Sequence, residues 1–320
     1  KWNRKKSENR SVNIIISYIL NLNSYKKYLA LIFITLTIIG ASSIKIDNYL
    51  TDEINTKSKL YADINYFDNN FGGIKPITIG SNSNIDFNNQ KNILKNLNEL
   101  NFKSDFVYNR NDSFLISARM NDIGSYKSNI AYNKIKEINN GKENLNISGI
   151  GYLFDNISNK LTLNILLGLI IAIIIIGLTF VVINDFNYKY FFVALLPNVV
   201  PVFTCLGILF FNGFYFSLSN AFILAIVFGL IVDDSIHIIS AYSINRKEKK
   251  TINESLEYCR KYTFKAVCKT TIVIIVSLTP LLFSEFKSIS QLAFITIISA
   301  TIAVIFDLLF LPSILKKYIK

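Results

Sequence analysis

Six long apolar stretches dominate this sequence, and each is long enough to cross the roughly 30 Å hydrocarbon core of a bilayer. Hydrophobic residues make up 51% of the 320-residue chain and the mean hydropathy is positive, values that soluble domains rarely reach together. The pattern therefore predicts a multi-pass membrane protein. The expected spans run from Tyr28 to Ile44, Leu161 to Ile183, Tyr190 to Phe211, Phe216 to Tyr242, Ala266 to Phe283 and Ile289 to Leu315.

A long polar block separates the first span from the other five and divides the chain into five parts. A basic segment, 1–27, leads into the transmembrane helix 28–44. The block, 45–160, is expected to fold as one domain outside the bilayer. A five-helix transmembrane region, 161–315, and a tail, 316–320, complete the chain. The expected fold class is a membrane α-helical bundle of six transmembrane helices with an extracytoplasmic α+β domain.

Lysine and arginine gather on one side of the expected membrane, which predicts its orientation. Seven basic residues precede the first span and seven lie between the fourth and fifth, whereas the two short loops on the opposite side hold only Lys287. We expect both termini in the cytoplasm, the bundle in the cytoplasmic (inner) membrane, and the polar domain in the periplasm or outside the cell. The two clusters are Lys1, Arg4, Lys5, Lys6, Arg10, Lys26, Lys27 and Arg246, Lys247, Lys249, Lys250, Arg260, Lys261, Lys265.

Alternation and helical spacing in the polar block predict the element order βαββαβ. This order is typical of the ferredoxin-like plan, in which two helices pack on one face of an antiparallel sheet. The expected strands are Lys75 to Gly80, Asp105 to Tyr108, Phe114 to Met120 and Leu145 to Ile150, and the expected helices are Phe87 to Leu100 and Ser125 to Ile138.

Charge and composition argue against several classes of function. The net charge of +12 does not indicate nucleic-acid binding, because the polar domain holds 14 basic and 13 acidic residues and so only +1 of that charge. The excess lies in the cytoplasmic clusters, where anionic lipid headgroups are the natural neighbours. With one histidine and no cysteine pair at ligand spacing, a structural zinc site has too few ligands, and we expect no cofactor. The polar domain contains no nucleophile and base pair, so we do not expect an enzyme.

Two carboxylates and an imidazole interrupt the fourth span, where Asp233, Asp234 and His237 lie in an otherwise apolar helix. Each carboxylate costs about 2.5 to 3.5 kcal/mol at mid-membrane, so something must offset that cost. An aspartate that alternates between protonated and ionised forms is a proton carrier, and we predict this role here. The alternatives are a buried structural pair and a helix end near the membrane interface.

The predicted proton relay comprises Asp233, Asp234, His237 and Asp307. Neighbouring helical positions differ by about 100°, so the two adjacent aspartates cannot face the same neighbour. We expect one of them to face the bundle interior, with His237 one turn from Asp233 on the same side. Asp307, in the sixth span, either serves a helix end near Pro312 or joins the relay, and His237 is alternatively a hydrogen-bonded interface residue.

Residues Gly229 to His237, with the sequence GLIVDDSIH, resemble a signature of the resistance-nodulation-division superfamily, in its hydrophobe exporter and mycobacterial membrane protein large (MMPL) branch. Tyr66 to Gly73 is similar to the segment that opens the porter domain there, and Gly149 to Asp155 to the segment that closes it. Asp307 to Pro312 resembles the end of the last span. The resemblance covers roughly Tyr28 to Leu315.

The resemblance implies the C-terminal half of a duplicated twelve-span pump, driven by the proton-motive force, that exports lipids or other hydrophobic molecules. It implies that protons bind the intramembrane acids at the interface between two six-span halves. The proton role carries over most directly to Asp233, because Asp234 stands where that branch usually has Tyr. The missing N-terminal half, fused or separate, is then a partner, together with protons, membrane lipids and a hydrophobic substrate. A homo-oligomer is also compatible with the sequence.

Two other functions stay open. An accessory subunit of the Sec protein-export translocon shares the six-span half and works as a separate short chain. A sterol-sensing-like regulator binds lipid without pumping. The chain opens without an initiator methionine, as expected of a fragment of a longer protein.

Overall fold

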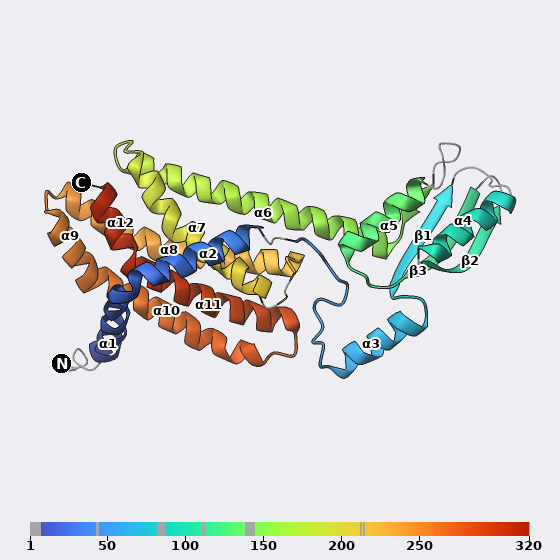
Figure 1. Ribbon diagram of the computed structural model, residues 1–320, viewed down its shortest axis with the longest axis horizontal. Coiled ribbons are helices and arrows are strands. Elements are labelled where there is room, and N and C mark those ends of the chain that lie inside the picture. The colour runs from blue at the N-terminus through green and yellow to red at the C-terminus, as the bar shows by residue number, and fades with distance from the viewer. Residues whose placement is uncertain are drawn as a thin grey trace, which may run out of the picture.

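The computed structural model describes residues 8–42, 45–81, 87–100, 102–110, 113–137, 145–211, 213 and 215–319. The molecule is elongated, with a bundle of long helices at one end and a small α+β domain at the other (Figure 1). The first and last helices, α1 (Glu8–Asn21) and α12 (Leu311–Tyr318), both lie at the end of the bundle remote from the α+β domain.

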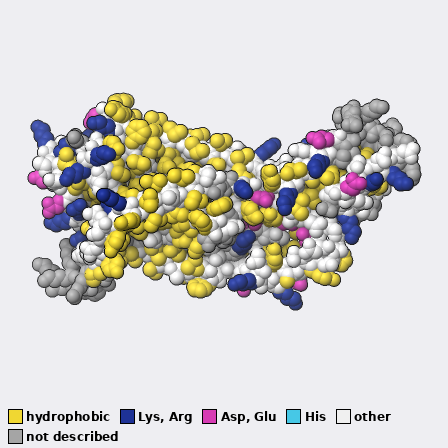
Figure 2. Space-filling model, viewed as in Figure 1, with side chains coloured by type: hydrophobic (Ala, Val, Ile, Leu, Met, Phe, Trp, Pro, Cys, Tyr) yellow, Lys and Arg dark blue, Asp and Glu magenta, His cyan; other side chains and the backbone are white. Residues whose placement is uncertain are grey.

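Six helical segments are long and apolar enough to cross a membrane, as the sequence predicts. Hydrophobic side chains cover the bundle in Figure 2, and Lys and Arg gather at its remote end. This belt is the surface expected to face lipid. Besides α1 and α12, the bundle contains α2 (Lys26–Ser42), α6 (Ile150–Ile183), α7 (Lys189–Phe211), α8 (Leu218–Lys247), α9 (Ile252–Tyr258), α10 (Phe264–Leu278) and α11 (Lys287–Leu309).

The expected cytoplasmic segment 1–27 contains a helix that the sequence analysis missed. Helix α1 joins α2 through a 3-10 turn, Leu22–Tyr25, and the first apolar segment therefore begins at Val12 instead of Tyr28. Val12 and Ile16 are buried in the same cluster as residues of α10 and α11. Residue 44, the expected end of the first span, lies outside the described residues.

Two further boundaries differ from the expectation. Helix α6 begins at Ile150, so the expected domain end at residue 160 falls inside a helix that continues from the α+β domain into the bundle. Its 34 residues extend about 51 Å at 1.5 Å per residue, more than a bilayer core requires. Phe216, expected in the fourth span, instead forms a parallel β-bridge with Ile46, and Ser217 caps α8.

The α+β domain contains a four-stranded antiparallel sheet with the strand order β2-β3-β1-β4. Its elements follow the chain order β1, α4, β2, β3, α5, β4, after a helix α3 that the sequence analysis did not predict. Their bounds are α3 (Lys59–Asn70), β1 (Lys75–Ser81), α4 (Phe87–Glu99), β2 (Phe102–Arg110), β3 (Ser113–Met120), α5 (Ser125–Glu137) and β4 (Asn146–Ser148).

One face of this sheet forms the domain core. Alternate residues of β1 and β3 are buried, which is the period expected of a sheet with one covered face. Ile79 and Ile116 belong to one hydrophobic cluster with Leu97 of α4 and Tyr132 of α5. Both helices therefore pack against the same face.

Small residues bring two bundle helices together. A Cβ atom on Gly40 of α2 would lie 2.0 Å from the carbonyl oxygen of Phe203, and one on Gly207 of α7 would lie 2.4 Å from that of Leu36. Backbone approach of this kind is the usual way in which membrane helices associate. It fixes α2 against α7 in the middle of the bundle.

Candidate functional site

The two adjacent aspartates of α8 face opposite environments. Asp234 is buried, with 7% of its surface exposed. The side chain of Asp233 is 67% exposed, and that of His237 is 65% exposed. The expectation that one aspartate faces the interior is thus confirmed, and the inward one is Asp234.

Helix α10 supplies the polar partners of Asp234. The hydroxyl of Thr270 lies 3.2 Å from Asp234 Oδ1, and that of Thr271 lies 3.4 Å from Oδ2. Each hydroxyl also lies within 2.9 Å of the Val267 carbonyl oxygen. A hydroxyl has a single proton but two lone pairs. These threonines can therefore donate a hydrogen bond to an ionised Asp234, or donate to their own helix and accept a hydrogen bond from a neutral Asp234.

Asp307 of α11 reaches the same layer of the bundle. The hydroxyl of Ser235 donates to its carboxylate at 3.1 and 3.2 Å, and both residues are fully buried. Since Ser235 follows Asp234 directly, Asp307 contacts α8 one residue away from Asp234. Asp307 therefore lies against α8 through Ser235, and its part in a proton relay stays a prediction.

No described lysine or arginine forms an ion pair with Asp234 or Asp307. The partners of this acid pair are hydroxyl groups only. A charge buried without a counterion costs several kcal/mol even after the protein relaxes. Proton binding removes that charge, and the surrounding hydroxyls adapt to either form.

Asp233 and His237 form a separate pair on the outer face of α8. The distance from His237 Nε2 to Asp233 Oδ1 is 3.6 Å. The same face carries the exposed side chains of Phe222 and Ile226 on one side of the pair and Ile244 on the other. The structure thus separates the four predicted relay residues into an inner acid pair and an outer Asp–His pair.

Three residues of the inner site were not among the predicted relay residues, namely Ser235, Thr270 and Thr271. Ser235 lies within the motif from Gly229 to His237 but carries no charge. The adjacent threonines in the fifth span were the available signal, because two hydroxyls in an apolar helix often serve a buried polar partner.

A segment after α2, residues 45–58, connects the bundle to the α+β domain, and we call it the clasp. Asn48 is its centre. Its side-chain oxygen accepts a hydrogen bond of 2.6 Å from the backbone N–H of Leu218, at the start of α8. Its backbone N–H donates to Ser125 Oγ at 2.9 Å, and its side-chain amide donates to Asn159 Oδ1 of α6 at 2.8 Å.

Acidic residues of the clasp hold the starts of α8 and α11. Glu53 accepts hydrogen bonds from Ser219 of α8 and Ser288 of α11. Lys287 Nζ lies 3.5 Å from Asp52 Oδ1. Burial raises the pKa of the Asp52 carboxyl above its ordinary value, and Lys287 acts in the opposite direction. The clasp therefore joins the beginnings of the two helices that carry Asp234 and Asp307.

A buried ionic network continues from the clasp into the α+β domain. Lys75 of β1 is fully buried, and its ammonium lies 2.8 Å from carboxylate oxygens of both Asp122 and Asp155. The hydroxyl of Tyr132 donates to Asp155 at 2.8 Å, and burial together with this carboxylate raises the pKa of Tyr132. Thr51 of the clasp donates to Asp122 through its backbone N–H and its hydroxyl, each at 3.1 Å.

These features define a multi-pass helical membrane protein with a polar acid site inside its bundle. Comparison with known families gives a more specific result. The profile described as "Protein export membrane protein SecD/SecF, C-terminal" matches residues 131–320, which is more than half of the chain and includes all four predicted relay residues. The chain belongs to this family, a membrane protein-export family related to the resistance-nodulation-division transporters. Comparison with curated proteins finds no significant match.

The family assignment refines the predicted resemblance. Relation to the resistance-nodulation-division transporters agrees with it at the level of the superfamily. Membership of the MMPL branch stays a prediction. The match begins at residue 131, after the first span and three of the four strands, so it concerns mainly α6 to α12.

Proposed function

We propose that this chain is a proton-coupled subunit of membrane protein export, forming one six-span half of a twelve-span assembly. One observation carries the proposal, namely the buried Asp234 and Asp307 pair, which has only hydroxyl partners in a SecD/SecF-family bundle. No catalytic chemistry and no cofactor are part of the proposal. Protons are the coupling ion.

Proton binding at the acid pair would change how α8 packs against α10 and α11. With both acids ionised, the two charges repel across the Ser235 contact, and neutralisation removes the repulsion. Moving one charge through the membrane potential supplies about 2.3 kcal/mol per 100 mV. That amount is enough to shift a conformational equilibrium whose states differ by a few kcal/mol.

The clasp would transmit such a shift to the α+β domain. Its hydrogen bonds hold the starts of α8 and α11 through Asn48 and Glu53. Its contacts with Ser125 and Asp122 hold the domain. A relative movement of the two helices therefore reaches a domain that we propose is a ferredoxin-like porter domain outside the cytoplasm.

The outer Asp233 and His237 pair would face the other six-span half. Charged side chains exposed to hydrocarbon are costly, and in membrane proteins such residues usually face a bundle interior or an aqueous path. A second half, fused or separate, would cover the pair and bring its own acids beside it. We propose that the assembly lies in the cytoplasmic membrane with both termini of this chain in the cytoplasm.

Proton-driven export of lipids or other hydrophobic molecules is the second candidate function. The observation that favours it is the sequence from Gly229 to His237, which resembles the MMPL signature. Both functions use the same proton site, so the substrate distinguishes them.

The test is transport into inverted membrane vesicles that contain the complete assembly, with and without a proton-motive force. The measurements are translocation of a secretory preprotein and transport of a fluorescent lipid. We expect Asp234→Asn and Asp307→Asn to abolish the stimulation of preprotein translocation by the proton-motive force. Asp185→Asn is the matched control, because Asp185 is exposed and pairs only with Lys247 among the described residues.

Each result has a distinct meaning. Stimulated lipid transport without stimulated preprotein translocation would favour the second candidate. Equal stimulation in the parent and in both Asn variants would contradict proton coupling at this site, and a lipid-binding regulator would then be the better account.

A further inference from the structure

A cavity of about 740 Å³ opens at the end of the bundle remote from the α+β domain. It lies between α1, α9 and the junction of α11 with α12. Its lining is amphipathic and includes the apolar side chains of Leu256 and Leu308 together with the charged side chains of Arg260 and Lys316. None of the residues of the inner acid pair or of the clasp lines this cavity.

Positive charge exceeds negative charge around this cavity. Among the described residues, neither Arg260 nor Lys316 forms an ion pair. Glu257 is the single acid in the lining. A third cation lies at the rim, since Lys26 Nζ donates a hydrogen bond to Ser313, which also lines the cavity.

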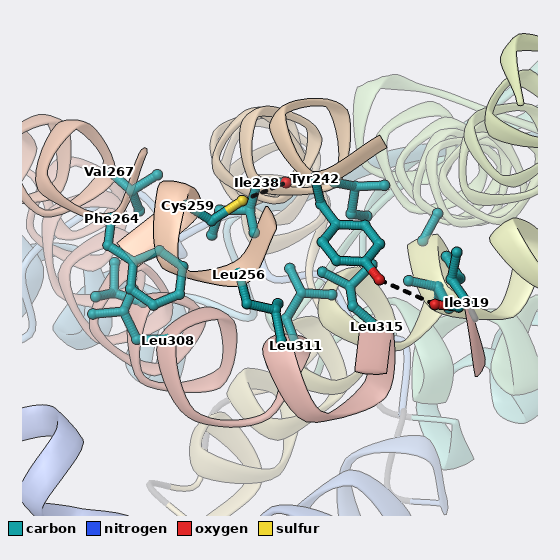
Figure 3. Packing of buried hydrophobic residues seen from close by; sticks show 14 of the residues in the cluster. Ile238, Tyr242, Leu256, Cys259, Phe264, Val267, Leu308, Leu311, Leu315 and Ile319 are labelled. Carbon is teal, nitrogen blue, oxygen red and sulfur yellow. Dashed lines mark hydrogen bonds between the residues drawn. The ribbon is translucent and has the colours of Figure 1, made fainter. Parts of the chain in front are cut away.

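The floor of the cavity belongs to a close-packed cluster and is therefore preformed. Leu256 and Leu308 pack in this cluster with Leu311, Leu315 and Phe264 (Figure 3). The hydroxyl of Tyr242 donates to the carbonyl of Ile319 at 3.0 Å and ties the end of the chain to α8 (Figure 3). A ligand could therefore bind here without a rearrangement of the residues that line the floor.

An apolar cavity of about 250 Å³ lies further along the same helices. Ile19 of α1, Ile272 of α10 and Val304 of α11 line it. Val304 is one helical turn from Leu308 of the first cavity. The seam between α1 and α11 therefore offers a basic, polar site at its end and an apolar slot, also lined by α10, further along.

We propose that this seam binds one anionic glycerophospholipid, with its phosphate at Arg260 and Lys316 and an acyl chain along α11 in the apolar slot between α1 and α10. Basic pockets between transmembrane helices at the membrane surface are suited to anionic headgroups. The lipid is a resident ligand, and the site goes beyond the proposed function, because neither proton coupling nor the transported substrate requires it.

The experiment measures equilibrium binding of a fluorescent phosphatidylglycerol to the purified full chain in mixed micelles, with fluorescent phosphatidylcholine as the neutral comparison. The double variant Arg260→Gln/Lys316→Gln should bind phosphatidylglycerol about 30-fold more weakly, which is about 2 kcal/mol at about 1 kcal/mol per basic residue. The matched control is Lys261→Gln/Lys317→Gln. It removes the same charge from adjacent positions whose ammonium groups lie over Tyr262 and Tyr318 instead of the cavity, and it should bind as the parent does.

A second variant guards against simple misfolding. Glu257→Gln removes the acid and should tighten phosphatidylglycerol binding about fivefold. Equal losses in the two double variants, equal binding of phosphatidylcholine, or no gain in Glu257→Gln would each overturn the proposal. Complete displacement of the lipid by soluble glycerol 3-phosphate at the same concentration would also overturn it, since the site would then bind a free phosphate ester.

Discussion

Two buried polar networks in this protein differ in how their charges are balanced. In the α+β domain, Lys75 lies between Asp122 and Asp155 at 2.8 Å from each. In the bundle, the hydrogen-bond partners of Asp234 and Asp307 among the described residues are the hydroxyls of Ser235, Thr270 and Thr271. A buried cation offsets the charge of neighbouring carboxylates, whereas a hydroxyl can donate to a carboxylate or accept from a carboxylic acid. The comparison favours a structural role for the first network, and the hydroxyl partners of the second support the titrating role that we propose for it.

The largest expected effect on stability comes from removing the buried cation. Lys75→Met would leave two buried carboxylates without their partner, which typically costs about 3 to 5 kcal/mol. Thermal or chemical unfolding of the purified chain measures the loss. Lys91→Met, at an exposed position of α4, is the control and should unfold as the parent does. Parent-like stability of Lys75→Met would show that the network does not hold the domain.

A smaller loss should follow from removing one hydrogen bond of the same network. Tyr132→Phe deletes the hydroxyl that donates to Asp155, and a hydrogen bond to a charged group contributes about 1.5 to 3 kcal/mol. Tyr126→Phe changes the same group at an exposed position and serves as the comparison in the same unfolding measurement. A loss no greater than that of Tyr126→Phe would assign the stability to the Lys75 ion pairs alone.

The bundle network should behave in the opposite way. Asp307→Asn keeps an acceptor for Ser235 and removes a chargeable group from a fully buried site. Replacing buried charge is often neutral for stability, so we expect a change below about 1 kcal/mol together with loss of proton coupling. Unfolding and vesicle transport are measured on the same preparation. A large loss of stability with transport retained would show that Asp307 has a structural role and no role in proton coupling.

The smallest effect concerns Asp52, in the clasp between the two regions. Because burial raises its folded pKa above the unfolded value, its favourable contribution is complete below the unfolded pKa and is lost as the pH rises through the folded pKa. The melting temperature of the parent relative to Asp52→Asn should therefore fall as the pH increases from the acidic range. A difference independent of pH would show that Lys287 fully compensates for the burial of this carboxyl.

The positions of the six spans were predictable because length and hydropathy are local properties of the sequence. Helix α1 was missed since its apolar residues, including Val12 and Ile16, lie within a polar, basic lead. The early start of α6 was missed because its first residues, before Leu161, are more polar than the expected span. Their backbone is nevertheless part of the same continuous helix. In both cases, the helix is stabilised by packing against other elements of the fold, which a hydropathy pattern does not register.

The rotation of α8 was the part of the site that sequence reasoning could not decide. Asp233 and Asp234 are the same residue type on adjacent faces, and only the position of Thr270 and Thr271 on α10 distinguishes them. The clasp was equally hidden, because Asn48 and Glu53 make their contacts with residues more than 75 positions away. Such contacts follow from the fold and have no local signature.

Infrared spectroscopy of the assembly in vesicles, recorded with and without an imposed proton gradient, tests the central claim most directly. The account predicts that the protonated-carboxyl stretch changes with the gradient, and that Asp234→Asn and Asp307→Asn each reduce the change while Asp185→Asn leaves it intact. A change that persists in full when both acids are replaced together, or no change in the parent, would contradict proton exchange at this pair.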